Sequence, residues 1–175
     1  VLEWFMREII GDTSQNAYTA MWQKVKLNGD GTVFIVPNFT DSKGKIIGLS
    51  ISNNKQDLFE ALIEGVTFEV KTILNSYMEF WKNSFEVVRV GGGLARAEQW
   101  MQLRADMFGR PIECMQNIEV SAVGAAILGA VAAGLYENHM EASKKMIGIE
   151  RYYEPNLPIY ERYEEKYKYY LQIKS

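Results

Sequence analysis

The sequence is poor in the residues that cross-link small proteins or form nitrogen–sulfur metal sites. It contains one cysteine, Cys114, and one histidine, His139, in 175 residues. A single cysteine excludes an internal disulfide and is typical of proteins kept in a reducing compartment. One histidine and one cysteine are also too few for a zinc site built from the usual ligands.

An excess of positive charge and a long apolar run are absent as well. The net charge is -3 and the isoelectric point is near 5.3, so neither nucleic acid nor an anionic membrane is an expected partner. The most apolar run, Ser121 to Tyr136, is shorter than the roughly 20 residues that a membrane-spanning helix needs. We interpret this run as a buried helix of a cytoplasmic protein.

What is present is the composition of one globular domain, with 47% apolar and 23% charged residues. The first ten residues, "VLEWFMREII", already carry an apolar stripe at helical spacing (Leu2, Phe5, Met6, Ile9, Ile10), yet no capping residue precedes it. From this we expect the chain to be a fragment, with part of the protein preceding it.

The first half of the chain reads as short elements followed by one long helix. A capping signal at residues 12–14 precedes a helix over 17–25, and strands are predicted over 33–37 and 46–52. The strongest periodicity predicts a helix over 57–78. Gly65 lies inside that helix, where glycine costs about 1 kcal/mol against alanine, so we expect another backbone to pass close to it.

The second half alternates strands and helices. Strands are predicted over 85–90 and 112–115, with a helix over 95–108 between them. A small-residue helix follows, with Ser121 as its N-cap and Gly134 as its C-cap. This alternation indicates an α/β domain with parallel strands. In the tail, "LPIYERYEEKYKYYLQIKS", four tyrosines share a helical face, which favours a terminal helix over 158–175 that packs on its own domain with the hydroxyls in water.

Three glycines, Gly91 to Gly93, separate the strand over 85–90 from the next helix. Glycines there leave N–H groups and bare backbone open to a ligand, although a tight turn packed under its own helix gives the same pattern. The dinucleotide fingerprint is broken because Arg96 occupies its third glycine position. Glu113 stands about where that fingerprint needs its ribose-binding acid, so a nicotinamide-dependent oxidoreductase stays open as a weak alternative.

Three longer segments carry a resemblance: "DLFEALIEGVTFEV" from Asp57, "VVRVGGGLARAEQWMQLRADMFGRPIE" from Val87, and "SAVGAAILGAVAAGLY" from Ser121. Together they resemble the carboxyl-terminal domain of the FGGY carbohydrate kinases, with a Glu-Gly pair, a glycine turn, a helix with Trp, Gln and Ala-Asp, a Gly-x-Pro strand and a Gly-Ala-Ala helix. The resemblance covers nearly the whole chain in a consistent order.

The resemblance implies a ribonuclease-H-like, actin-type ATPase fold, with a mixed sheet flanked by helices and the amino-terminal strands of the domain missing. Residues 1–175 would form most of the carboxyl-terminal, nucleotide-binding domain of a two-domain kinase. The intact protein would transfer the γ-phosphoryl group of MgATP to a hydroxyl of a sugar or polyol. It would bind ATP and ADP, contact the sugar through the missing amino-terminal domain, and form a homodimer.

Carried over by position, Gly91, Gly92, Gly93, Arg96 and Ala97 would form the nucleoside-binding site. Arg96 is expected to stack on the purine or bond to it, whereas Ala97 replaces a serine found in many members of the family. The chain would hold no catalytic residue, because the aspartate base and the phosphate-gripping hairpin lie upstream, and no metal ligand of its own.

Two carboxylates, Glu64 and Asp106, are interpreted as structural bridges between helices, and the fragment alone is expected to be inactive. The segment 38–45 is much shorter than the family's loop, which leaves the sub-family open. A non-catalytic actin-like module for regulation or assembly is the main alternative function.

Overall fold

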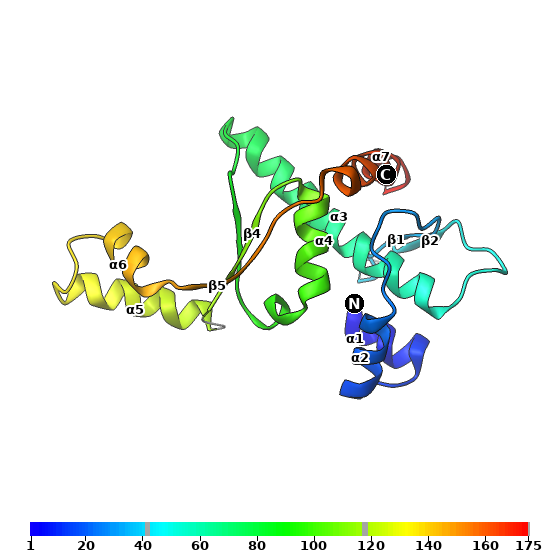
Figure 1. Ribbon diagram of the computed structural model, residues 1–175, viewed down its shortest axis with the longest axis horizontal. Helices are drawn as coiled ribbons and strands as arrows, with labels where there is room; N and C mark the ends of the chain where they lie inside the picture. Colours follow the sequence, from blue (N-terminus) through cyan, green and yellow to red (C-terminus); the bar gives the residue numbers. More distant parts are fainter. Residues whose placement is uncertain (41–42, 117–118, 175) are drawn as a thin grey trace. The chain divides into compact units, whose positions relative to one another are not determined.

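The computed structural model describes residues 1–40, 43–116 and 119–174 (Figure 1). These residues form two compact units. The first unit comprises Val1–Ser84, Asp106–Gly109 and Asn156–Ser175, and the second comprises Phe85–Ala105 and Arg110–Pro155.

The first unit is built around one long helix, α3 (Lys55–Trp81). Asn54 caps its amino terminus in a capping box with Asp57. The Asn54 side chain accepts a hydrogen bond from the backbone N–H of Gln56, and the Asp57 side chain accepts one from the backbone N–H of Asn54. The helix predicted over 57–78 was right in type, two residues short at its amino end and three residues short at its carboxyl end. Its buried face contributes more apolar residues to the core of this unit than any other element does.

A two-stranded antiparallel sheet lies against α3. The strands are β1 (Phe34–Val36) and β2 (Lys45–Ile47), with Phe34 opposite Ile47. A Cβ atom at Gly65 would overlap the backbone carbonyl oxygen of Ile35, deep inside van der Waals contact. The expected close approach of another backbone at Gly65 is thus confirmed, and the backbone is that of β1.

The strand predicted over 46–52 is wrong beyond Ile47. Gly48 adopts a left-handed conformation (φ 82°), which turns the chain away from the pairing direction of β2. A side chain at this position would also collide with the carbonyl oxygen of Thr32, so the turn requires glycine.

Two short helical segments open the chain and cover the start of α3. The first is α1 (Leu2–Phe5), continued by the π-helical turn η1 (Met6–Ile10), and the second is α2 (Gln15–Gln23). The Ser14 hydroxyl caps α2 by accepting from the N–H of Ala17 at 3.2 Å, as the polar break predicted. Aromatic side chains from both segments, Phe5 and Trp22, contact the ring of Phe59 on α3.

The terminal helix α7 (Leu157–Lys174) pairs with α3 through buried polar groups. The Tyr163 hydroxyl donates to Glu64 Oε1 at 2.8 Å, and the Tyr170 hydroxyl donates to Glu69 Oε1 at 2.5 Å. The tyrosine hydroxyls were expected in water, and that expectation is wrong for these two. They are buried because α3 presents carboxylates at the positions that face them.

The second unit contains a three-stranded mixed sheet in the order β3–β4–β5. Its strands are β3 (Val88–Val90), β4 (Ile112–Met115) and β5 (Ile149–Tyr153). β3 and β4 are parallel, as predicted, whereas β5 is antiparallel to β4. The strand β5 was not predicted, because Glu150, Arg151 and two tyrosines give it no continuous apolar run.

Helical segments connect the strands. The turn η2 (Gly93–Arg96) leads into α4 (Glu98–Phe108), and α5 (Val120–Ala132) is followed by α6 (His139–Met146). The helix predicted over 95–108 is interrupted at Ala97, whose ψ of 87° is not helical. The helix α6 was not predicted.

The small-residue helix α5 differs most from expectation. Glu119 is its N-cap position, so the predicted cap Ser121 lies inside the helix, whereas Gly134 takes the left-handed conformation expected after its end. Only Ile127 is buried, while Leu128 is 60% exposed. Gly124 has no atom within 4 Å of an added Cβ, so no neighbouring element requires a glycine there. Among the described elements, α6 packs most extensively against α5.

Candidate functional site

The glycine turn connects the carboxyl end of β3 to η2. Gly92 has φ 87° and ψ 179°, a conformation that side-chain-bearing residues rarely adopt. The carbonyl oxygen of Gly92 accepts a hydrogen bond from the N–H of Ala95 at 3.1 Å, which closes the turn. Within the described residues, the N–H groups of Gly92 and Gly93 have no backbone acceptor, so they can donate to a ligand.

The three glycines have different surroundings. A Cβ atom at Gly91 would collide with the Val120 side chain and lie 2.8 Å from Cε of Met115, so this glycine is needed for packing within the unit. At Gly92 and Gly93 an added Cβ would meet no atom within 4 Å. The open stretch of bare backbone is therefore Gly92–Gly93, at the carboxyl end of a strand that is parallel to its neighbour.

The two predicted residues after the glycines also lie at the turn. Arg96 is exposed at the end of η2, and its guanidinium can reach a ligand on the turn. Ala97 has its backbone engaged at both ends, since its N–H donates to Leu94 and its carbonyl accepts from Met101. Because its side chain is a methyl group, Ala97 can contribute only an apolar contact.

Two residues at the turn were missed by the sequence analysis. Leu94 is 50% exposed beside the open glycines and offers apolar surface to a flat ring. Arg151, on β5, donates to the carbonyl oxygen of Ala95 at 3.3 Å and to Glu98 Oε1 at 3.0 Å. Arg151 thereby ties η2 and the start of α4 to the sheet. No sequence signal could have found it, because β5 itself was not predicted.

The surrounding groups do not form a catalytic or metal centre. In the described ranges, no three histidine, cysteine, aspartate or glutamate side chains are grouped so that they could hold a metal ion. Burial raises the pKa of the Cys114 thiol, which keeps it protonated and unreactive. The carboxylate next to the turn in the sequence, Glu98, is held in an ion pair with Arg151.

The carboxylates considered as site residues from the sequence are engaged in other contacts. Asp106 Oδ1 accepts from the N–H of Asn156 at 2.8 Å, which joins the end of α4 to the start of α7 within the first unit. Glu64 is paired with α7, as described above. Glu113 accepts from Nε of Arg89 at 2.7 Å, so the residue considered for ribose binding is part of an ion pair on the sheet.

None of the described helices is long and apolar enough to cross a membrane.

Comparison with known proteins identifies the family of this chain. The family model of the carboxyl-terminal domain of the FGGY carbohydrate kinases matches residues 23–133. Glycerol kinase from Fusobacterium nucleatum is 28% identical over 98% of this chain and 35% of its own length. Xylulose kinase from Bacillus subtilis is 25% identical over 98% of the chain and 36% of its own length. The chain thus spans about a third of the length of these relatives.

Solved structures agree on the fold. Gluconate kinase from Lactobacillus acidophilus superimposes with a TM-score of 0.85 over 99% of this chain and 37% of its own, at 18% identity. Glycerol kinase from Plasmodium falciparum, solved with ADP, gives a TM-score of 0.79 over 98% of the chain and 35% of its own, at 18% identity. This likeness confirms the predicted fold class, an actin-type ATPase domain with a mixed sheet flanked by helices.

Proposed function

Since the chain belongs to the FGGY family of carbohydrate kinases, as a carboxyl-terminal domain, we propose that it is the nucleotide-binding part of an ATP-dependent sugar or polyol kinase. The observation that carries the proposal is the bare backbone at Gly92 and Gly93, where no atom lies within 4 Å of an added Cβ. A purine ring can lie flat against such backbone, because no side chain separates the two.

The residues of the turn have distinct parts in this proposal. The N–H groups of Gly92 and Gly93 face the nucleoside, Leu94 provides apolar contact, and the Arg96 guanidinium stacks on the purine. Because Gly91 has no side chain, the Val120 side chain can pack against it and support the turn. Arg151 holds the far end of the turn in place.

The chemistry itself would require the rest of the protein. Phosphoryl transfer depends on positioning the reactants and on stabilising the negative charge of the transferred group. The described residues include no grouped set of magnesium ligands, so Mg²⁺ would enter with the ATP phosphates. The base that accepts the hydroxyl proton would come from the part of the kinase outside this chain.

We expect the 175-residue chain to show no ATP-dependent phosphorylation of any sugar or polyol, because it binds nucleotide without supplying a base. A coupled assay that follows ADP release measures this directly, with the intact kinase as the positive control. Turnover by the 175 residues alone would contradict the proposal.

Replacing Gly93 with valine in the intact kinase should raise the KM for ATP by about tenfold or more, because branched carbons would occupy the space proposed for the base. Gly93 does not have a positive φ, so valine introduces no left-handed strain there. Gly93→Ala should give a smaller increase, and the KM for the sugar and the melting temperature should change little in both variants. An unchanged KM for ATP in Gly93→Val would place the nucleotide elsewhere.

A further inference from the structure

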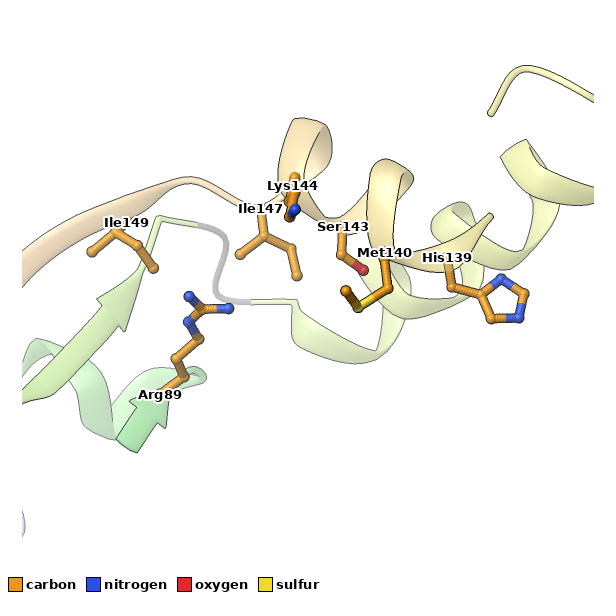
Figure 2. Close-up of a pocket in the computed structure, with 7 residues that line it drawn as sticks. All are labelled: Arg89, His139, Met140, Ser143, Lys144, Ile147 and Ile149. Atoms are coloured by element: carbon orange, nitrogen blue, oxygen red, sulfur yellow. The ribbon is translucent and has the colours of Figure 1, made fainter. Parts of the chain in front are cut away.

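A second feature of the same unit is a pocket between the sheet and α6, separate in its lining from the glycine turn. Its volume is about 540 Å³, within the range of roughly 300–1,000 Å³ that is usual for small-molecule sites. We call it the α6 pocket. Figure 2 shows Arg89 rising from β3 on one side and residues of α6 on the other.

One face of α6 is shaped to line this pocket. His139, Met140, Ser143 and Lys144 occupy positions i, i+1, i+4 and i+5, which form two neighbouring rows on one side of a helix. Ala142, on another side, is fully buried and anchors the helix within the unit. The lining face is therefore fixed by packing and presented to the pocket rather than to the core.

The charge of the lining is positive. Arg89 and Lys144 are the ionised groups that line the pocket, and no carboxylate lines it among the described residues. Arg89 uses Nε to pair with Glu113 on the neighbouring strand, which leaves its two terminal nitrogens available. No carboxylate in the described ranges pairs with Lys144.

The lining of the pocket combines polar and apolar side chains. The Ser143 side chain lies next to Lys144 on α6, while Met140, Ile147 and Ile149 add apolar surface. Two cations and a hydroxyl match a dianion with several acceptor oxygens. Apolar surface and a volume well above that of a single ion match an attached carbon group.

We propose that the α6 pocket binds a small organic phosphate monoester, with its phosphate between Arg89 and Lys144 and its carbon part against Met140 and Ile147. Ser143 donates its hydroxyl hydrogen to a phosphate oxygen. This inference does not depend on nucleotide binding at the glycine turn, since the two sites share no lining residue. It predicts a phosphate-ester site that belongs to this chain itself.

Titration of the ¹⁵N-labelled 175-residue chain with phenyl phosphate tests the proposal by NMR at low salt. Amide signals of β3 and α6 should shift and saturate, and Lys144→Ala should weaken the affinity by about tenfold, the usual effect of losing one charge-assisted contact. Lys145→Ala is the matched control. Lys145 is the next residue of the same helix, is exposed and carries the same charge, but does not line the pocket.

Each outcome of this experiment decides the matter. Both substitutions put alanine, the best helix former, at exposed positions of α6, so circular dichroism should show both variants folded. Equal weakening in the two variants, or no saturable shift in the unchanged chain, would overturn the site. Inorganic phosphate should bind more weakly than phenyl phosphate and phenol should not bind; equal affinity for inorganic phosphate would overturn the ester assignment.

Discussion

Gly65→Ala should destabilise the chain by about 3 kcal/mol, the upper range of overpacking effects, although alanine is the better helix former. The added methyl group would overlap the Ile35 carbonyl oxygen. That oxygen cannot move aside easily, because Ile35 is buried at 2% exposure and its strand is paired with β2. Either α3 or β1 must shift, and both carry core residues.

Urea unfolding of the 175-residue chain, followed by circular dichroism, measures the effect. Gly129→Ala is the matched control, since Gly129 also lies inside a helix but has no atom within 4 Å of an added Cβ. The control should be more stable than the unchanged chain by about 0.5–1 kcal/mol, from helix propensity alone. A Gly65→Ala variant as stable as the control would show that β1 does not pass against α3.

Lys166→Met should cost about 3–5 kcal/mol, the usual penalty for leaving a buried charge without its partner. Lys166 Nζ lies 2.5 Å from Glu64 Oε2, and the two side chains are each 6% exposed. The Tyr163 hydroxyl is the other group bonded to this carboxylate, and it cannot compensate a full charge. Lys168→Met, at an exposed position two residues further along α7, should change the stability by less than about 0.5 kcal/mol.

The double variant Glu64→Gln/Lys166→Met separates the loss of charge pairing from the loss of packing. It removes both charges, so it should be more stable than Lys166→Met alone. A double variant that is less stable than the single variant would show that the carboxylate is not the source of the penalty.

The penalty in Lys166→Met should also depend on pH. Burial raises the pKa of Glu64, and Lys166 opposes that rise, so removing the lysine raises the folded-state pKa further. A carboxyl whose folded pKa lies above its unfolded value binds more protons when folded, and stability then falls as pH rises between the two values. Unfolding midpoints should therefore show a smaller difference between the variant and the unchanged chain at pH 5 than at pH 8. An equal difference at both would contradict a charged Glu64.

The parts that the sequence predicted well are those encoded locally. The helix around Gly65 has a long apolar stripe, and β4 (Ile112–Met115) matched its predicted ends because a turn precedes it and its side chains alternate. The glycine turn was located from three adjacent residues. In each case the signal lies within about 20 residues of the element that it specifies.

The parts that were missed depend on residues far apart in the chain. Arg151 reaches the glycine turn from a strand more than 50 residues later, and β5 joins the sheet by pairing with β4 rather than by an apolar pattern of its own. The tyrosine hydroxyls of α7 were expected in water, because only the fold places Glu64 and Glu69 opposite two of them. Likewise, neither Arg89 nor Lys144 stands out until the fold brings β3 and α6 to the same pocket.

The path of the backbone limits how this chain can be divided into shorter fragments that fold. The chain passes from one unit to the other after Ser84, Ala105, Gly109 and Pro155, so neither unit is a single continuous stretch. A gene shortened to end at Ser84 would encode α3 without α7, and the carboxylate of Glu64 would be made without Tyr163 or Lys166. During synthesis on the ribosome, the core of the first unit can therefore form only after the segment from Asn156 onward has emerged.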